Sequence, residues 1–199
     1  MKSVACDAAG VAAAADVVLG GGVVVIPTDT VYGLAAHPAF PEAVARLYTL
    51  KARAAQKPIA LLAADTAAAT RFLGGALPPG AAALAARAWP GALTLVLPVA
   101  GATGERYEGV RVPDHAWTRR LLAACGGVLR VTSANMSGRR PATDAPSALA
   151  AVGLGADLVV DGGISPGGVA STVVRIDRAG CRTVLREGPV AVAAVEGAP

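Results

Sequence analysis

Short runs of β-branched and apolar residues alternate along this chain with alanine-rich stretches of helical length. Apolar strands separated by helices are typical of an α/β domain, in which helices pack on a sheet. We expect helices over residues 7–19, 41–51, 79–89, 115–124 and 145–152, and one between a cap at Asp65 and Gly74-Gly75. We expect strands over residues 23–26, 59–63, 93–97, 109–112, 128–131, 157–160, 171–176 and 183–185. Some of these strands follow one another without a helix, which favours an open, twisted, mixed sheet.

The chain has 199 residues, of which 54% are hydrophobic and 16% are charged. A chain of this length and composition can bury one sizeable core, so we expect a single domain over residues 1–199. Asp16 and three glycines interrupt the longest apolar stretch, residues 11–27, so we expect no membrane span. The first residues lack the apolar segment and cleavage site of a signal peptide, which predicts a cytoplasmic protein. Cys6, Cys125 and Cys181 form no close pair, so we expect buried, reduced thiols and neither a disulfide nor a zinc site.

Polar side chains follow the predicted strand 23–26 directly, in the segment PTDTVYGL over residues 27–34. Ligands of open α/β sheets bind at the carboxyl ends of strands. The hydroxyls and carboxylate of Thr28, Asp29, Thr30 and Tyr32 are therefore candidates for holding a small polar ligand. A turn in which Thr and Asp bond the backbone is an equally good interpretation of the same residues.

Cations gather before the next predicted strand, where Lys51, Arg53 and Lys57 fall within seven residues. The chain has only three lysines, so two of them in one short segment favour a function, with Lys as a point charge and Arg as a bidentate fork for phosphate oxygens. The alternative is a solvated helix end whose cations face the helix dipole. We expect Lys51 and Arg53 to face solvent, so that alanine at either position leaves the fold intact.

A third polar segment, VTSANMSGRRPATDA over residues 131–145, also leaves a predicted strand. Its backbone amides and hydroxyls, beside Arg139 and Arg140, can form an anion-binding concavity, although each such loop alone could be an ordinary connection. The glycine-rich segment 162–168 is either a lid or a plain connector. Arg111 lies among apolar residues and requires an anionic partner, which could be internal or a substrate, and Arg186 has the same two interpretations.

Several catalytic motifs are absent from the sequence. It contains neither a G-x-x-x-x-G-K-[ST] phosphate loop nor a G-x-G-x-x-G fingerprint. His37 and His115 are its only histidines, and neither lies in a triad or metal-ligand pattern. Any catalysis must therefore rest on positioning and charge.

Together the polar segments resemble one family, the YrdC-type threonylcarbamoyl-AMP synthases. The matching motifs occur in family order from about residue 10 to residue 190: PTDTVYGL, Lys51-x-Arg53 with Lys57-Pro58, WPGALTLVLP, VRVPDH, TSANMSG, and STVV with VLREG. The resemblance implies an open α/β fold with a twisted mixed sheet and flanking helices around a large, basic, concave cavity.

The resemblance also implies a reaction. L-threonine, bicarbonate and ATP give threonylcarbamoyl-adenylate and pyrophosphate, and other proteins transfer the threonylcarbamoyl group to tRNA. The carboxylated threonine amine is itself the nucleophile at the α-phosphorus, so the protein has to supply alignment and cations, with Mg²⁺ as the assisting ion. No residue is assigned to hold a metal.

The resemblance assigns roles to the motif residues. Lys51 and Arg53 are the implied catalytic residues, so alanine at either position should abolish ATP use. Those implied to lie along the nucleotide are Lys51, Arg53, Lys57, Ser133, Asn135 and Arg186. Those implied to hold threonine are Thr30, Tyr32, Arg111 and Ser171.

Three residues depart from the family pattern and concern the amino-acid pocket most. Ala54 stands where a proline is common, Leu62 where some relatives have a threonine-binding histidine, and Tyr107 where a threonine is frequent.

Two other functions remain open. With a net charge of +4 and a pI near 9.3, the chain could be a non-catalytic RNA-binding relative. Carbamoyl-adenylate chemistry, as in related domains of hydrogenase-maturation proteins, is the other.

Overall fold

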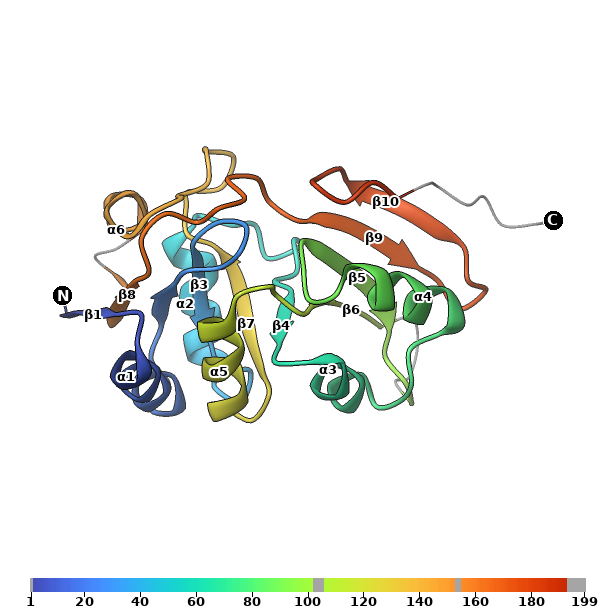
Figure 1. Ribbon diagram of the computed structural model, residues 1–199, viewed down its shortest axis with the longest axis horizontal. Helices are drawn as coiled ribbons and strands as arrows, with labels where there is room; N and C mark the ends of the chain where they lie inside the picture. Colours follow the sequence, from blue (N-terminus) through green and yellow to red (C-terminus); the bar gives the residue numbers. More distant parts are fainter. Residues whose placement is uncertain (1, 102–105, 153–154, 193–199) are drawn as a thin grey trace.

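The computed structural model describes residues 2–101, 106–152 and 155–192. Its ten strands form one mixed sheet in the order β1-β8-β2-β3-β7-β4-β6-β5-β9-β10, which begins with β1 and β8 at the left of Figure 1. Parallel pairs alternate irregularly with antiparallel pairs, so the predicted mixed sheet is confirmed. The strands are β1 (Lys2–Ala5), β2 (Val24–Ile26), β3 (Gly33–Ala36), β4 (Leu61–Ala63), β5 (Leu93–Pro98), β6 (Tyr107–Arg111), β7 (Val128–Ser133), β8 (Leu158–Asp161), β9 (Thr172–Ile176) and β10 (Arg182–Arg186).

Six helices flank this sheet in the described ranges, and all six were predicted. They are α1 (Ala8–Leu19), α2 (Pro41–Leu50), α3 (Thr66–Leu73), α4 (Pro79–Ala88), α5 (Ala116–Ala124) and α6 (Ala145–Val152). Asp7 and Asp65 cap α1 and α3 by accepting hydrogen bonds from backbone N–H groups three residues further on. His115 caps α5 in the same way, since its ring nitrogen accepts from the backbone N–H of Thr118.

Helices cover the two halves of the sheet differently. In the half that contains β2, Val24 and Ile26 pack towards α1 and α5, whereas Val25 packs towards α2 and α6. In the half that contains β5 and β6, one face packs on α3 and α4 (Figure 1). Alternate residues of these strands point to the opposite face. That second face is the floor of the cavity described below.

Two strands were not predicted. β1 is a short edge strand that pairs with β8, and three of its four residues are exposed, so no hydrophobic pattern marks it. β3 has the sequence GLAA, which has little intrinsic preference for a strand. Tertiary contacts make these residues a strand, because β3 lies between β2 and β7 and pairs with both. Part of the segment expected to be a polar loop, Gly33 and Leu34, is therefore strand.

The cysteines agree only partly with the prediction. All three are free thiols, and Cys125 is buried, but Cys6 and Cys181 are partly exposed. Burial raises the pKa of the Cys125 thiol to about 11. Among the described residues, none of the helices is long and apolar enough to cross a membrane.

Candidate functional site

A cavity of about 610 Å³ lies over the face of the sheet that α3 and α4 leave free. Its floor is made by alternate residues of β4, β5, β6 and β9, and its walls by the segments that follow β2 and α2, by the end of β7 and by the end of β10. None of the described residues that line it belongs to a helix. The lining includes four arginines, Arg53, Arg111, Arg175 and Arg186, and no described Asp or Glu.

Arg111 is the buried cation of the cavity, with 5% of its surface exposed. Its guanidinium donates to the backbone oxygen of Gly91 (2.9 Å), to Thr30 Oγ1 (2.9 Å) and to Asp29 Oδ1 (2.5 Å). Burial lowers the pKa of Arg111, and the carboxylate of Asp29 opposes this shift. The required anionic partner is thus the internal Asp29, and Arg111 still has two N–H groups without a protein acceptor in the described residues.

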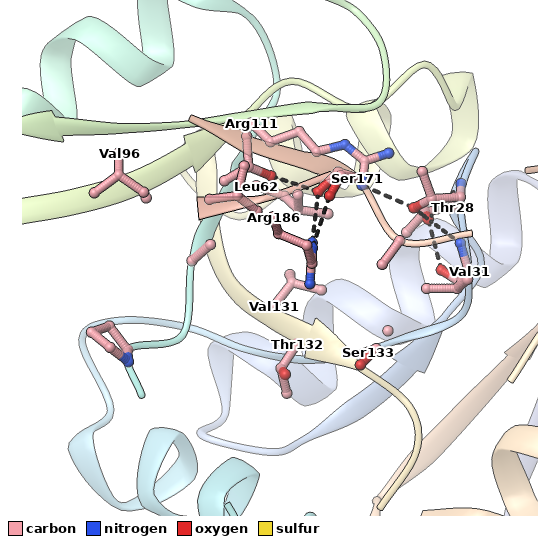
Figure 2. Close-up of a pocket in the computed structure, with 18 of the residues that line it drawn as sticks. Thr28, Val31, Leu62, Val96, Arg111, Val131, Thr132, Ser133, Ser171 and Arg186 are labelled. Atoms are coloured by element: carbon pink, nitrogen blue, oxygen red, sulfur yellow. Dashed lines mark hydrogen bonds between the residues drawn. The ribbon is translucent and has the colours of Figure 1, made fainter. Parts of the chain in front are cut away.

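Ser171 joins two elements at the cavity wall. Its Oγ lies 2.8 Å from Thr94 Oγ1, and Arg186 donates to both its backbone oxygen (3.0 Å) and its Oγ (3.2 Å). Figure 2 shows Ser171 between Arg111 and Arg186. Partial burial, followed by the charges of Arg111 and Arg53, lowers the pKa of Arg186. Hydroxyls and guanidinium groups therefore converge on one side of the cavity.

A β-bulge brings Arg186 to the cavity. The register between β9 and β10 shifts between Val184 and Arg186, so that Leu185 is an extra residue. Successive strand residues normally point to opposite faces, but a bulge changes this alternation. Both Leu185 and Arg186 therefore line the cavity.

Arg53 also faces the cavity, and its partners are neutral. Its side chain donates to the backbone oxygens of Lys57 (2.8 Å) and Pro58 (3.0 Å). The side chain of Lys57 is exposed and is not part of the lining. Within the described ranges neither Arg53 nor Arg186 forms a salt bridge. These two guanidinium groups are therefore available to a ligand anion.

Lys51 is not where the sequence predicted it. The prediction that it faces solvent is wrong, because only 2% of its surface is exposed and it does not line the cavity. Its ammonium donates to backbone and side-chain oxygens of Ser133 and Asn135. Arg53 is only partly exposed. The difference arises because the end of α2 packs against a segment more than 80 residues away, which local sequence does not reveal.

For the segment after β2, both interpretations hold in part: one threonine forms a turn with the backbone, and another faces the cavity. Thr28 forms the turn, because its hydroxyl donates to the backbone oxygen of Val31 and accepts from the N–H groups of Thr30 and Val31. Thr30 Oγ1 lies 3.0 Å from Thr28 Oγ1 and also accepts a hydrogen bond from Arg111. Tyr32 lies along the cavity, but its hydroxyl is used elsewhere: it donates to the backbone oxygen of Gly163 (2.7 Å) and accepts from the N–H of Gly162 (3.0 Å).

Seven of the ten predicted site residues line this one cavity, and three do not. Those that line it are Thr30, Tyr32, Arg53, Arg111, Ser133, Ser171 and Arg186. Lys51, Lys57 and Asn135 lie outside its lining. Their roles towards substrates stay predictions.

Two functional candidates were missed by the sequence analysis. Thr94 on β5 bonds Ser171, and Arg175 on β9 stacks on the ring of Tyr107 at 4.1 Å. Both lie on strands whose other face is apolar core, between Leu93 and Leu95 and between Val174 and Ile176. A polar residue at alternate positions of an otherwise apolar strand was the signal that could have found them.

Gly188 lies so close to Ser171 that a side chain there would displace the site. An added Cβ would come within 2.5 Å of Thr172 N and 2.7 Å of Ser171 C. Gly188→Ala is expected to lower the free energy of unfolding by about 1–3 kcal/mol, since backbone has to move. Urea unfolding measures this loss. Gly75→Ala is the matched control, because its Cβ would meet only Ala100 at 3.5 Å, and equal losses in both variants would contradict the expectation.

Comparison with known proteins gives the same family by sequence and by structure. The family model Sua5_yciO_yrdC, described as "Telomere recombination", matches residues 16–188. The chain is 38% identical over 173 residues to the threonylcarbamoyl-AMP synthase of Alkalilimnicola ehrlichii, which covers 84% of this chain and 85% of the relative. It is also 38% identical to the threonylcarbamoyl-AMP synthase of Halorhodospira halophila, over 71% of this chain and 77% of that protein.

A solved structure also resembles this fold. P. abyssi Sua5 complexed with L-threonine superimposes with a TM-score of 0.79 at 31% identity over 87% of this chain. The superposition spans 53% of that Sua5 chain, so the relative contains a large part that this comparison does not cover.

Proposed function

Because this chain belongs to the Sua5/YciO/YrdC family, we propose that it is a nucleotidyltransferase that makes L-threonylcarbamoyl-AMP from L-threonine, bicarbonate and ATP with release of pyrophosphate. The observation that carries the proposal is the placement of Arg53 and Arg186, without carboxylate partners in the described residues, in the same cavity as the Arg111–Thr30 pair. Cations suit a triphosphate, and a buried guanidinium beside hydroxyls suits an amino acid.

In the proposed reaction the protein aligns reactants that carry their own nucleophile. Bicarbonate and the threonine amine give a carbamate and water, and a carbamate oxygen then attacks the α-phosphorus while pyrophosphate leaves. Arg111, with Thr30 and Ser171, holds the amino acid. Arg53 and Arg186, with Ser133, face the nucleotide and stabilise the charge that develops on pyrophosphate. No side chain has to form a covalent intermediate.

Mg²⁺ enters this proposal as part of the ATP complex. Mg²⁺ is usually held by one or two carboxylates, waters and substrate phosphates. The described residues include no group of three His, Cys, Asp or Glu side chains that could hold a metal, and Asp29 is already paired with Arg111. The triphosphate would therefore supply the ligands of Mg²⁺, and the protein would hold the complex through its arginines.

The step that follows this reaction and its place in the cell are also proposals. Other proteins would transfer the threonylcarbamoyl group to tRNA, in the cytoplasm. The net positive charge of +4 is compatible with direct RNA contact as well. A purely RNA-binding protein, however, would not need Arg111, Asp29 and Thr30 joined in a buried pocket.

Pyrophosphate release tests the proposal. The purified protein is incubated with ATP, Mg²⁺ and bicarbonate, together with threonine, carbamoyl phosphate or neither. We expect pyrophosphate only when threonine is present, and mass spectrometry should detect threonylcarbamoyl-AMP. Release that requires carbamoyl phosphate would favour carbamoyl-adenylate chemistry. Salt-sensitive RNA binding without any release would favour the RNA-binding alternative.

A further inference from the structure

We propose that Lys51 is a positioning residue, which acts on the reaction through the segment Ser133–Arg139 rather than by touching the nucleotide. The proposal rests on the proposed function. The ammonium of Lys51 donates to the backbone oxygen of Ser133, to Ser133 Oγ (3.2 Å), to the backbone oxygen of Asn135 (2.5 Å) and to Asn135 Oδ1 (3.1 Å). The backbone oxygen of Lys51 accepts in turn from the N–H of Ser137 (2.9 Å). Lys51 thus ties the end of α2 to the end of β7 at several points.

All the side-chain partners of Lys51 in the described residues are neutral oxygens. An ammonium has three N–H groups, and here four oxygens of one segment surround it. A buried cation costs free energy unless hydrogen bonds replace its hydration. A phosphate could bind the Lys51 ammonium only if some of these bonds broke. The arrangement therefore favours a fixed clamp over a free phosphate ligand.

The clamped segment connects Lys51 to the cavity. Ser133 lines the cavity directly. Asn135 does not, but its amide donates to the backbone oxygens of Met136 (3.0 Å) and Arg139 (2.6 Å) and so closes the turn that follows. On the other side of the clamp, Arg53 lies two residues after Lys51 and faces the cavity. Lys51 consequently sets the separation between Arg53 and Ser133, which come from distant parts of the chain.

The protonation of Lys51 supplies a second readout. Burial, and then the charge of Arg53, lowers the pKa of Lys51 to about 8. Charged Lys51 offers three N–H donors to the segment, whereas the neutral amine offers two. The clamp should therefore loosen as the pH rises through about 8. Arginine at position 51 would stay charged throughout this range.

Hydrogen exchange without nucleotide distinguishes a clamp from a phosphate ligand. In Lys51→Met we expect faster amide exchange within residues 134–139, and a fall in kcat/KM for pyrophosphate release of about 10²-fold, the scale for a displaced catalytic group. The matched control is Lys2→Met, since Lys2 is an exposed lysine on the edge strand β1. We expect neither change in this control.

The results of this experiment distinguish Lys51 as a clamp from Lys51 as a phosphate ligand. Unchanged exchange of residues 134–139 together with weaker ATP binding would overturn the proposal, because Lys51 would then act on the nucleotide directly. If the wild-type protein released no pyrophosphate, the proposed function would fail, and exchange would still decide whether Lys51 holds the segment.

A second measurement applies even if Lys51→Met does not fold. The protection factors of residues 134–139 in the wild-type protein should fall between pH 7 and pH 9, while those of β7 stay constant. They should not fall in Lys51→Arg. Protection that is independent of pH in the wild type would also overturn the proposal.

Discussion

Arg186→Met is expected to lower threonine-dependent pyrophosphate release by about 10²–10³-fold, which is the usual effect of removing one donor to a developing negative charge. Arg186 lies at the end of β10 and faces the cavity with no carboxylate partner among the described residues. Its two bonds go to the backbone oxygen and hydroxyl of Ser171. The loss should fall on kcat, because charge on the pyrophosphate grows between bound ATP and the transition state.

The fold should survive this substitution. The side chain of Arg186 is exposed to the cavity, so its removal leaves no buried charge without a partner. Arg182→Met is the matched control on the same strand, because Arg182 points to Gly80 on α4 rather than into the cavity. Steady-state kinetics of both variants, with urea unfolding, provide the measurement. Equal kinetics for Arg186→Met and wild type would show that Arg186 does not take part in the proposed reaction.

Much of the fold could be predicted because local pattern and tertiary structure agree. In β5 the apolar residues Leu93, Leu95 and Leu97 face α3 and α4, and the same spacing is visible in the sequence. β3 could not be predicted, since its Gly and Ala residues become a strand only between two neighbours. The convergence of the polar segments on one cavity was predicted from their places after strands and from the family resemblance.

The details of the site depended on contacts that sequence does not encode locally. Lys51 and Arg53 are two residues apart and looked alike, yet one is a buried clamp and the other faces the cavity. Tyr32 was expected to hold threonine, but its hydroxyl bonds the backbone of Gly162 and Gly163. The partners of Lys51 and Tyr32 lie more than 80 residues away. Residue type therefore predicted which side chains lie at or near the site, and the fold determines which atoms each of them contacts.

The ion pair between Arg111 and Asp29 has the largest expected effect on stability. The exposed fractions of the two side chains are 6% and 12%. Removing one partner of a buried pair leaves the other charge without compensation, which typically costs about 3–5 kcal/mol. Asp29→Ala should therefore lower the free energy of unfolding by about this amount, as measured by urea unfolding. Asp16→Ala, at an exposed position of α1, should leave it almost unchanged.

A double variant of Asp29 and Arg111 separates the contribution of this ion pair to stability from the role of Arg111 in the reaction. Adding Arg111→Met to Asp29→Ala removes the uncompensated charge, so most of the lost stability should return. Pyrophosphate release should not return, because Arg111 and its bond to Thr30 are lost from the cavity. A double variant as unstable as Asp29→Ala would mean that the carboxylate stabilises the fold through other contacts. A double variant with restored release would mean that the amino acid is held elsewhere, and Ser171 would then be the next residue to replace.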